Sequence, residues 1–246
     1  GSGSSWKQFG QDILGESTGD ESGDIVALSA DGTIVAISAH GNGGNGDQSG
    51  HVRVYRIEVD GAGWGWKQLG QDIDGEAAQD RSGWLALSAD GKTVAIGAHA
   101  NDGNGSNTGH VRVYRLEDDG PGLRWKQLGQ DINGEAEENN SGKSLALSAD
   151  GKTLAIGSMI HYYGANPGIG HVRVYTIGED GTSWKQLGMH IANEMEGDMS
   201  GYRVYQTVAL SLDGETLAVG YSSKDGRLSS EFGWQTTHYK VYAIGY

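Results

Sequence analysis

The chain has 246 residues, a formal net charge of −14 and no cysteine, and glycine accounts for 43 of its residues. An acidic chain repels phosphate backbones, so nucleic acid is excluded as a partner, and the lack of cysteine excludes disulfides, thiolate metal sites and a cysteine nucleophile. Only 2 prolines accompany the glycines and no apolar run approaches the roughly 18 residues of a membrane helix, so we expect neither a collagen-like chain nor membrane insertion.

Four copies of one sequence unit follow each other along the chain. The units open on a Trp-Lys-Gln segment at Trp6, Trp66, Trp125 and Trp184, with spacings of 60, 59 and 59 residues. Each unit continues with Ala-Leu-Ser-x-Asp-Gly and a short apolar run. Gly-His-Val-Arg-Val-Tyr closes the first three units and recurs in altered form at 237–242. Such regularity indicates a repeat architecture with one supersecondary motif in each unit.

The repeated segments have the pattern of strands and turns. They are short, alternating or β-branched, and bounded by Gly, Asn or Asp. Asp-Gly pairs at 31–32, 90–91, 150–151 and 213–214 predict tight hairpin turns between two such strands. Four strands in each unit predict an all-β fold, a four-bladed β-propeller with four-stranded antiparallel blades.

The order of the segments also predicts how the ring closes. The chain starts on a Trp-Lys-Gln strand and ends on the strand at 237–242, so the last blade lacks its outer strand. We expect Trp6–Ile13 to join this C-terminal blade and close the ring within a monomer. A fragment of a larger ring and two chains that share one ring are the alternatives. Residues 1–5 look like a remnant of cloning, and residues 6–246 are predicted to form a single propeller domain.

The units resemble FG-GAP-type repeats, the blades of integrin α-subunit propellers and of many secreted proteins. The matching segments are Trp-x-Gln at Trp66, Val-Ala-Leu-Ser at Val26 and Val208, Ile-Gly-Ala at Ile96, the loop 101–105 and Gly-x-Val-x-Val-Tyr at Gly109. His40 or His99 replaces the proline that the family usually has after Gly-Ala, and the strict Asp-x-Asp-x-Asp-Gly calcium loop is absent. The resemblance implies a propeller in a secreted or cell-surface protein.

Two glycine-punctuated loops are candidate cation sites. Their oxygen-bearing side chains are Asn42, Asn45, Asp47, Asn101, Asp102 and Asn104. Calcium takes six to eight oxygen ligands, and glycine lets backbone carbonyls contribute to them. Ordinary turn chemistry explains the same Asn-Gly steps. Calcium is therefore the one cofactor that the sequence predicts, with low affinity.

A histidine and an arginine recur near the start of the third strand in the first three units. The histidines are His51, His110 and His171, and the arginines are Arg53, Arg112 and Arg173. Because they repeat with the fold, we expect structural roles for them. The arginines are predicted to pair with Asp12, Asp72 and Asp131 between blades.

Residues that break the repeat are the candidates for a specific binding site. All four methionines lie between residues 159 and 199, among aromatic side chains. By loop phase these segments share one face of adjacent blades, so they predict an adaptable contact patch. The patch consists of Met159, His161, Tyr162, Tyr163, Met195, Met199, Tyr202, Phe232 and Trp234. A degenerate last blade that needs extra hydrophobic cover explains the same residues.

These observations predict a non-catalytic, extracellular propeller that binds a protein or a glycan through this patch. One alternative is a lyase or hydrolase that uses His161, His190, Glu194 and Tyr202 for acid–base catalysis on the same face. The other is a structural repeat domain of natural or engineered origin.

Overall fold

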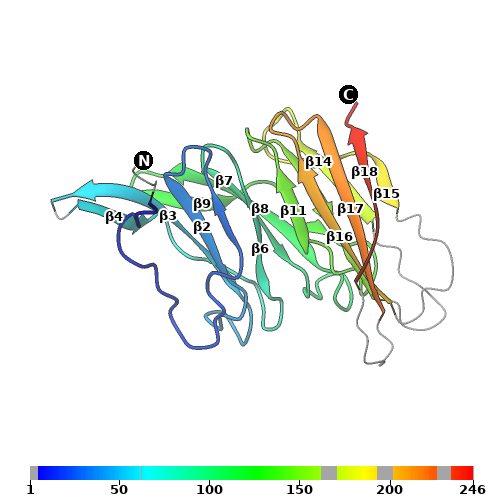
Figure 1. Cartoon of the computed structure of the whole chain (residues 1–246), viewed down its shortest axis with the longest axis horizontal. Helices are drawn as coiled ribbons and strands as arrows, with labels where there is room; N and C mark the ends of the chain where they lie inside the picture. Colours follow the sequence, from blue (N-terminus) through cyan, green and yellow to red (C-terminus); the bar gives the residue numbers. More distant parts are fainter. Residues whose placement is uncertain (1–4, 62, 162–170, 193–201, 226–233, 246) are drawn as a thin grey trace.

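Antiparallel β-sheets make up the whole of the described fold (Figure 1). The computed structural model describes residues 5–61, 63–161, 171–192, 202–225 and 234–245, and for a few strand residues beside the gaps it describes the backbone alone. No helix occurs in these ranges, and none of their segments has the length and apolar character of a membrane-spanning helix.

The first two sheets have five strands each. The first contains β1 (Val26–Leu28), β2 (Ile34–Ala39), β3 (His51–Asp60), β4 (Gly63–Gln68) and β5 (Ile73–Asp74), which pairs with β3. The second contains β6 (Ser82–Leu87), β7 (Thr93–Ala98), β8 (His110–Asp118), β9 (Leu123–Gln127) and β10 (Ile132–Asn133), which pairs with β8.

The third and fourth sheets have four strands each. The third contains β11 (Ser144–Leu147), β12 (Thr153–Gly157), β14 (His171–Ile177) and β15 (Trp184–Ala192). The fourth contains β13 (Met159–His161), β16 (Tyr202–Leu210), β17 (Thr216–Asp225) and β18 (Trp234–Ala243). The prediction of an all-β chain with four antiparallel, blade-like units is therefore confirmed.

The Asp-Gly hairpins form for a local reason. In the first, Asp31 Oδ1 accepts hydrogen bonds from Ser29 Oγ at 2.6 Å and from the Thr33 amide at 3.0 Å. Gly32 follows with a backbone φ of 71°, a value that residues with a side chain rarely adopt. The same bonds recur around Asp90, Asp150 and Asp213. The six-residue pattern is thus sufficient to fold each turn.

The outer strand of each of the first three sheets comes from the next sequence unit, as the order of the segments predicted. Strands β4, β9 and β15 carry Trp66, Trp125 and Trp184. Each outer strand is antiparallel to the preceding His-Val-Arg-Val-Tyr strand.

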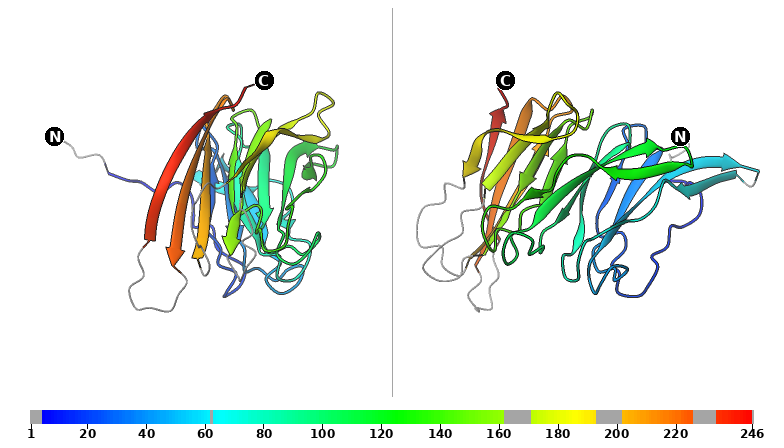
Figure 2. Two further views of the ribbon diagram at one scale, coloured as in Figure 1. Left: turned by 90° about the vertical axis from the view of Figure 1, so that its right-hand side faces the viewer. Right: turned by 180° about the vertical axis from the view of Figure 1, so that it is seen from behind.

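Three hydrophobic cores hold the sheets together, one between each successive pair. The first core joins Val52 and Val54 of β3 to Leu85 and Val94 of the second sheet. The second joins Val111 of β8 to Ile156 of β12, and the third joins Val172 of β14 to Val219 of β17. Figures 1 and 2 show the consequence: the sheets lie side by side along the long axis, with the first and the fourth at opposite ends.

The predicted ring closure is not found among the described residues, and the expected place of Trp6–Ile13 is corrected. This segment forms no strand and lies beside the first sheet instead of pairing with β18. The Trp66 indole holds it there by donating to the Phe9 carbonyl oxygen at 3.1 Å. In the described structure the outer strand of the fourth sheet is missing and Trp6 is fully exposed.

Candidate functional site

The loops that precede the first strand of a sheet and those that join its second and third strands meet on one face of the molecule. An acid and an amide connect them in the first two units. Asn42 Nδ2 donates to Asp20 Oδ2, and Asn101 Nδ2 donates to Asp80 Oδ2, both at 2.9 Å. All four residues are buried, so these bonds stabilise the loops and repeat with the fold.

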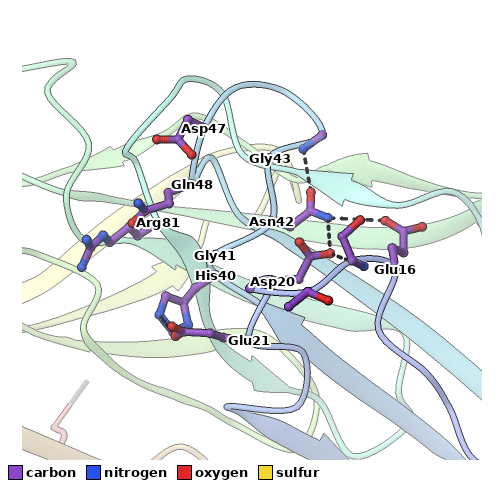
Figure 3. Close-up of a pocket in the computed structure, with 14 residues that line it drawn as sticks. Glu16, Asp20, Glu21, His40, Gly41, Asn42, Gly43, Asp47, Gln48 and Arg81 are labelled. Carbon is purple, nitrogen blue, oxygen red and sulfur yellow. Dashed lines mark hydrogen bonds and ion pairs between the residues drawn. The ribbon is translucent and has the colours of Figure 1, made fainter.

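In the first unit the same loops enclose a cavity of about 800 Å³ (Figure 3). The charged and ionisable side chains in its wall are Glu16, Asp20, Glu21, His40, Asp47 and Arg81. Because carboxylates outnumber cationic groups, the cavity favours neutral or cationic ligands over anions.

His40 and Glu21 lie together at one edge of this cavity (Figure 3). His40 Nε2 is 2.8 Å from Glu21 Oε2, and His40 Nδ1 is 3.5 Å from Asp24 Oδ2. The imidazole is 17% exposed, whereas both carboxylates are largely exposed. The imidazole therefore lies between two carboxylates, and a carboxylate beside an imidazole fixes the orientation of the ring.

An aromatic row extends from this histidine across the neighbouring unit. The Trp84 ring lies between the rings of His40 and His99, with centroid separations of 5.6 and 4.5 Å. Lys143 Nζ lies 5.4 Å from the Trp84 ring centroid. The half-buried indole is thus packed against two imidazoles and the Lys143 ammonium, and it does not line the cavity.

Glu21, Asp24 and Trp84 were not predicted as site residues, although the sequence contains a signal for them. The three units read Ser-Gly-Asp, Ser-Gly-Trp and Ser-Gly-Lys at residues 22–24, 82–84 and 141–143. The third residue of each triplet differs in charge and size while its neighbours repeat. Position-by-position comparison of the units would have found it.

The repeated histidines and arginines form ion clusters between the sequence units, which supports their structural role. Arg112 contacts Glu76 and binds Asp131 through a 3.0 Å hydrogen bond from Nε to Oδ1, as predicted for this aspartate. The other two pairings are corrected: Arg53 and Arg173 pair with Glu16 and Glu135, each at 3.4 Å. The glutamates reach these arginines because they lie in the loop that precedes each sheet.

Two of these clusters have the spacing of a metal site. Glu16, His51 and Asp72 form one, and Glu76, His110 and Asp131 form the other, with ligand atoms within 4.8 Å of one another. A guanidinium already bonds to carboxylates in both clusters. The positive charge of the guanidinium repels a metal cation, so we interpret both clusters as internal ion pairs and not as metal sites.

Most of the predicted calcium ligands make hydrogen bonds within or between loops. Asn42 Oδ1 accepts from the Gly44 amide, and Asp102 Oδ1 accepts from the Asn107 amide. The remaining bonds run between units: Asn45 Nδ2 to the Gly75 carbonyl oxygen at 2.8 Å, Asn104 Nδ2 to that of Gly134 at 3.1 Å, and Gln79 Nε2 to Asp47 Oδ2 at 2.8 Å.

The predicted contact patch falls mostly outside the described residues. The patch residues outside the described ranges are Tyr162, Tyr163, Met195, Met199 and Phe232, and Glu194 of the predicted enzyme site also lies outside them. The backbone places Met159 opposite Tyr205 and His161 opposite Arg203, one residue beyond Tyr202. Trp234 of β18 lies opposite Lys224 of β17.

His190, a candidate in the predicted enzyme site, is exposed on β15 and contacts a repeated histidine. Its ring centroid lies 4.5 Å from that of His171. Burial lowers the pKa of His171 from its ordinary value, and the neighbouring charge of His190 lowers it further.

Comparison with known proteins gave likenesses in structure only. No family model matches the chain, and neither does any curated protein. A prolyl endopeptidase structure covers 87% of the chain with 17% identity and a TM-score of 0.37. A periplasmic gluconolactonase from Pseudomonas aeruginosa covers 86% with 15% identity and a TM-score of 0.35, and the tricorn protease covers 89% with 10% identity and a TM-score of 0.36. The chain spans 27% of the prolyl endopeptidase and tricorn chains and 71% of the gluconolactonase chain.

The prediction of a non-catalytic binding module is corrected on this finding. The similar structures are enzymes, two of them peptidases and one a lactonase. The resemblance to FG-GAP repeats has no matching family model and remains a resemblance in sequence.

Proposed function

We propose that the chain is a hydrolase whose general acid–base residue is His40. The observation that carries the proposal is the 2.8 Å contact between His40 Nε2 and Glu21 Oε2 at the wall of the 800 Å³ cavity. Histidine suits this role because an imidazole has two ring nitrogens, of which one can accept a proton while the other donates one.

Each neighbour of His40 has a distinct part in this proposal. Glu21 orients the imidazole and stabilises its protonated form, as a carboxylate does in a catalytic His–carboxylate pair. Asp24, 3.5 Å from the other ring nitrogen, adds to that stabilisation. Trp84 packs against the ring and restricts its rotation.

The wall of the cavity favours a neutral, hydroxyl-rich substrate. Carboxylates repel phosphate esters and other anions, whereas carboxylate and amide groups form hydrogen bonds with hydroxyls. Esters, lactones and glycosides of sugars have this chemistry.

A panel of model substrates tests the proposal. Nitrophenyl acetate, nitrophenyl glycosides and glucono-δ-lactone should include at least one substrate, and nitrophenyl phosphate should not be hydrolysed. His40→Asn and Glu21→Gln should each lower kcat by about 100-fold or more, the usual effect of losing acid–base catalysis.

Two further variants complete this experiment. Glu137→Gln removes an exposed acid from the equivalent loop of the third unit, outside the cavity, and should retain full activity. His190→Ala examines the alternative site predicted from the sequence. The proposal is wrong if the wild-type chain hydrolyses none of the panel, or if His40→Asn retains activity while His190→Ala loses it.

Export to the cell surface or medium and weak calcium binding stay predictions. The Oδ1 atom of Asn42, a group that a calcium ion would need, already accepts a hydrogen bond from the Gly44 amide. We therefore propose no catalytic part for a metal ion in the cavity.

A further inference from the structure

Every interface between successive sheets combines the same two kinds of sheet face. One face packs on the preceding sheet, as Leu85 and Val94 of the second sheet do. The opposite face packs on the following sheet, as Val111 and Val113 do. The chain contains this interface three times.

The two end sheets leave one face of each kind uncovered in the described structure. On the first sheet, Val26 and Leu28 are each 60% exposed, and they are the counterparts of Leu85 and Leu87. On the fourth sheet, Tyr239 is 79% and Val241 62% exposed, and they are the counterparts of Val52 and Val54. The uncovered face of the first sheet and that of the fourth sheet thus correspond to the two sides of the repeated interface.

Two glycines identify the same missing contacts independently. A Cβ on Gly91 would lie 2.6 Å from Ile34 of the preceding sheet, whereas the equivalent Gly32 has no described atom within 4 Å. Gly70 and Gly129 pack against the tryptophans of the following sheets, Trp125 and Trp184, respectively. The equivalent Gly188 has none of the described atoms within 4 Å of such a Cβ.

The segment that carries Trp6 forms no strand, but it makes two of the hydrogen bonds that its repeats make. The Trp66 indole donates to the Phe9 carbonyl oxygen, as Trp125 and Trp184 donate to their counterparts. Gln8 Nε2 donates to Asp12 Oδ1 at 2.8 Å, which reproduces the Gln127–Asp131 bond. The segment is thus held on the first sheet, with Trp6 and Lys7 projecting beyond it.

We propose that this surface binds a second copy of the chain in a head-to-tail contact. The fourth sheet of one copy packs on the first sheet of the other, burying Tyr239 and Val241 against Val26 and Leu28. The Trp6 strand of the second copy then becomes the missing outer strand beside β18, and its indole occupies the open space at Gly188.

The arrangement of the chain favours a second copy over its own first sheet. The two uncovered faces lie at opposite ends of the molecule (Figures 1 and 2). Bringing them together within one chain would require all three packed cores to shift, and close-packed cores resist such deformation. A second copy forms the contact with each core unchanged.

The absence of cysteine makes a direct test available. In the repeats, Lys67 lies opposite Arg56 and Lys126 opposite Arg115, so the proposed contact places Lys7 opposite Ala243. Cα atoms of directly opposed residues in antiparallel strands are about 4.5–5.5 Å apart, a separation that a disulfide spans. We would mix purified Lys7→Cys and Ala243→Cys chains, oxidise them with diamide, and separate the products on a non-reducing gel.

The expected product is a disulfide-linked pair of chains that contains one copy of each variant, with neither variant alone giving the same yield. Replacing Trp6 with alanine in the Lys7→Cys chain should weaken the contact by about 30-fold, the effect of losing a central aromatic residue at an interface. Two results overturn the proposal. One is a mixture that stays monomeric, and the other is a Lys7→Cys/Ala243→Cys double variant that forms its disulfide only within one chain.

Discussion

Histidines at two different positions of the repeat differ in what they can do, because their surroundings differ. His110 lies buried behind Arg112, in an ion cluster that repeats with the fold. His40 lies at a cavity, between two carboxylates that the other units do not have. A repeated residue type is therefore structural in one loop and chemically available in another.

The buried histidines should make the protein less stable in mild acid. Burial lowers the pKa of His110 from 6.5, and Arg112 lowers it further, although Asp131 and Glu76 oppose the change. Between the lowered value and 6.5 the unfolded chain binds more protons than the folded one, so stability falls as the pH drops below about 6.5.

Thermal unfolding at several pH values between 7 and 5 measures this effect. The decrease in Tm over that range should be smaller in His110→Asn than in the wild type, and His171→Asn should act in the same direction because the pKa of His171 is also lowered. Asp131, whose pKa is lowered below 3.8 mainly by its bond to Arg112 in opposition to burial, loses its contribution only in stronger acid. An unchanged slope in both variants would contradict the assignment.

At the scale of the element, the hairpins are local units whose surroundings differ from sheet to sheet. Gly32 and Gly91 occupy the same turn position, with φ values of 71° and 69°. Only Gly91 packs against a neighbouring sheet, through Ile34. Because the two glycines have the same backbone geometry but different packing, a substitution at both positions can separate the two effects.

Alanine at the two positions should separate backbone strain from packing. Gly32→Ala should cost about 1 kcal/mol, because an alanine at positive φ is strained. Gly91→Ala should cost a further 1–3 kcal/mol or so, because its Cβ would overpack the core beside Ile34. Chemical denaturation of both variants at low protein concentration measures the difference. Equal losses would show that the sheets do not pack as described.

At the scale of the whole molecule, charge opposes the association that the end sheets favour. Two chains of net charge −14 repel each other, and salt screens that repulsion while leaving the apolar contact intact. We therefore expect the mass measured by light scattering to rise with both protein and salt concentration.

Aspartate variants locate this association on the molecule. Val26→Asp with Leu28→Asp should keep the chain monomeric at all salt concentrations, because the charges would be buried in the contact. Leu123→Asp, on an exposed edge of the second sheet, should associate like the wild type. Loss of association in the Leu123→Asp control alone would place the contact elsewhere.

The sequence by itself determined the features that depend on nearby residues. The Asp-Gly turns form because Asp31 and its equivalents bond to residues two positions away, and alternating apolar residues identify the strands that these turns join. The origin of each outer strand in the next unit also followed from the order of segments, because the same order occurs four times.

Only the tertiary structure decided which distant groups meet. Glu21 and His40 are not adjacent in the sequence, and their contact depends on how two loops pack around Asp20 and Asn42. Likewise, Trp6 has the same sequence context as Trp125, yet it is exposed while Trp125 is buried. The physical reason is that a repeated sequence specifies the two faces of an interface but does not specify which sheet covers each face. The covering sheet depends on the curvature of the packed sheets and, in our proposal, on a second copy of the chain.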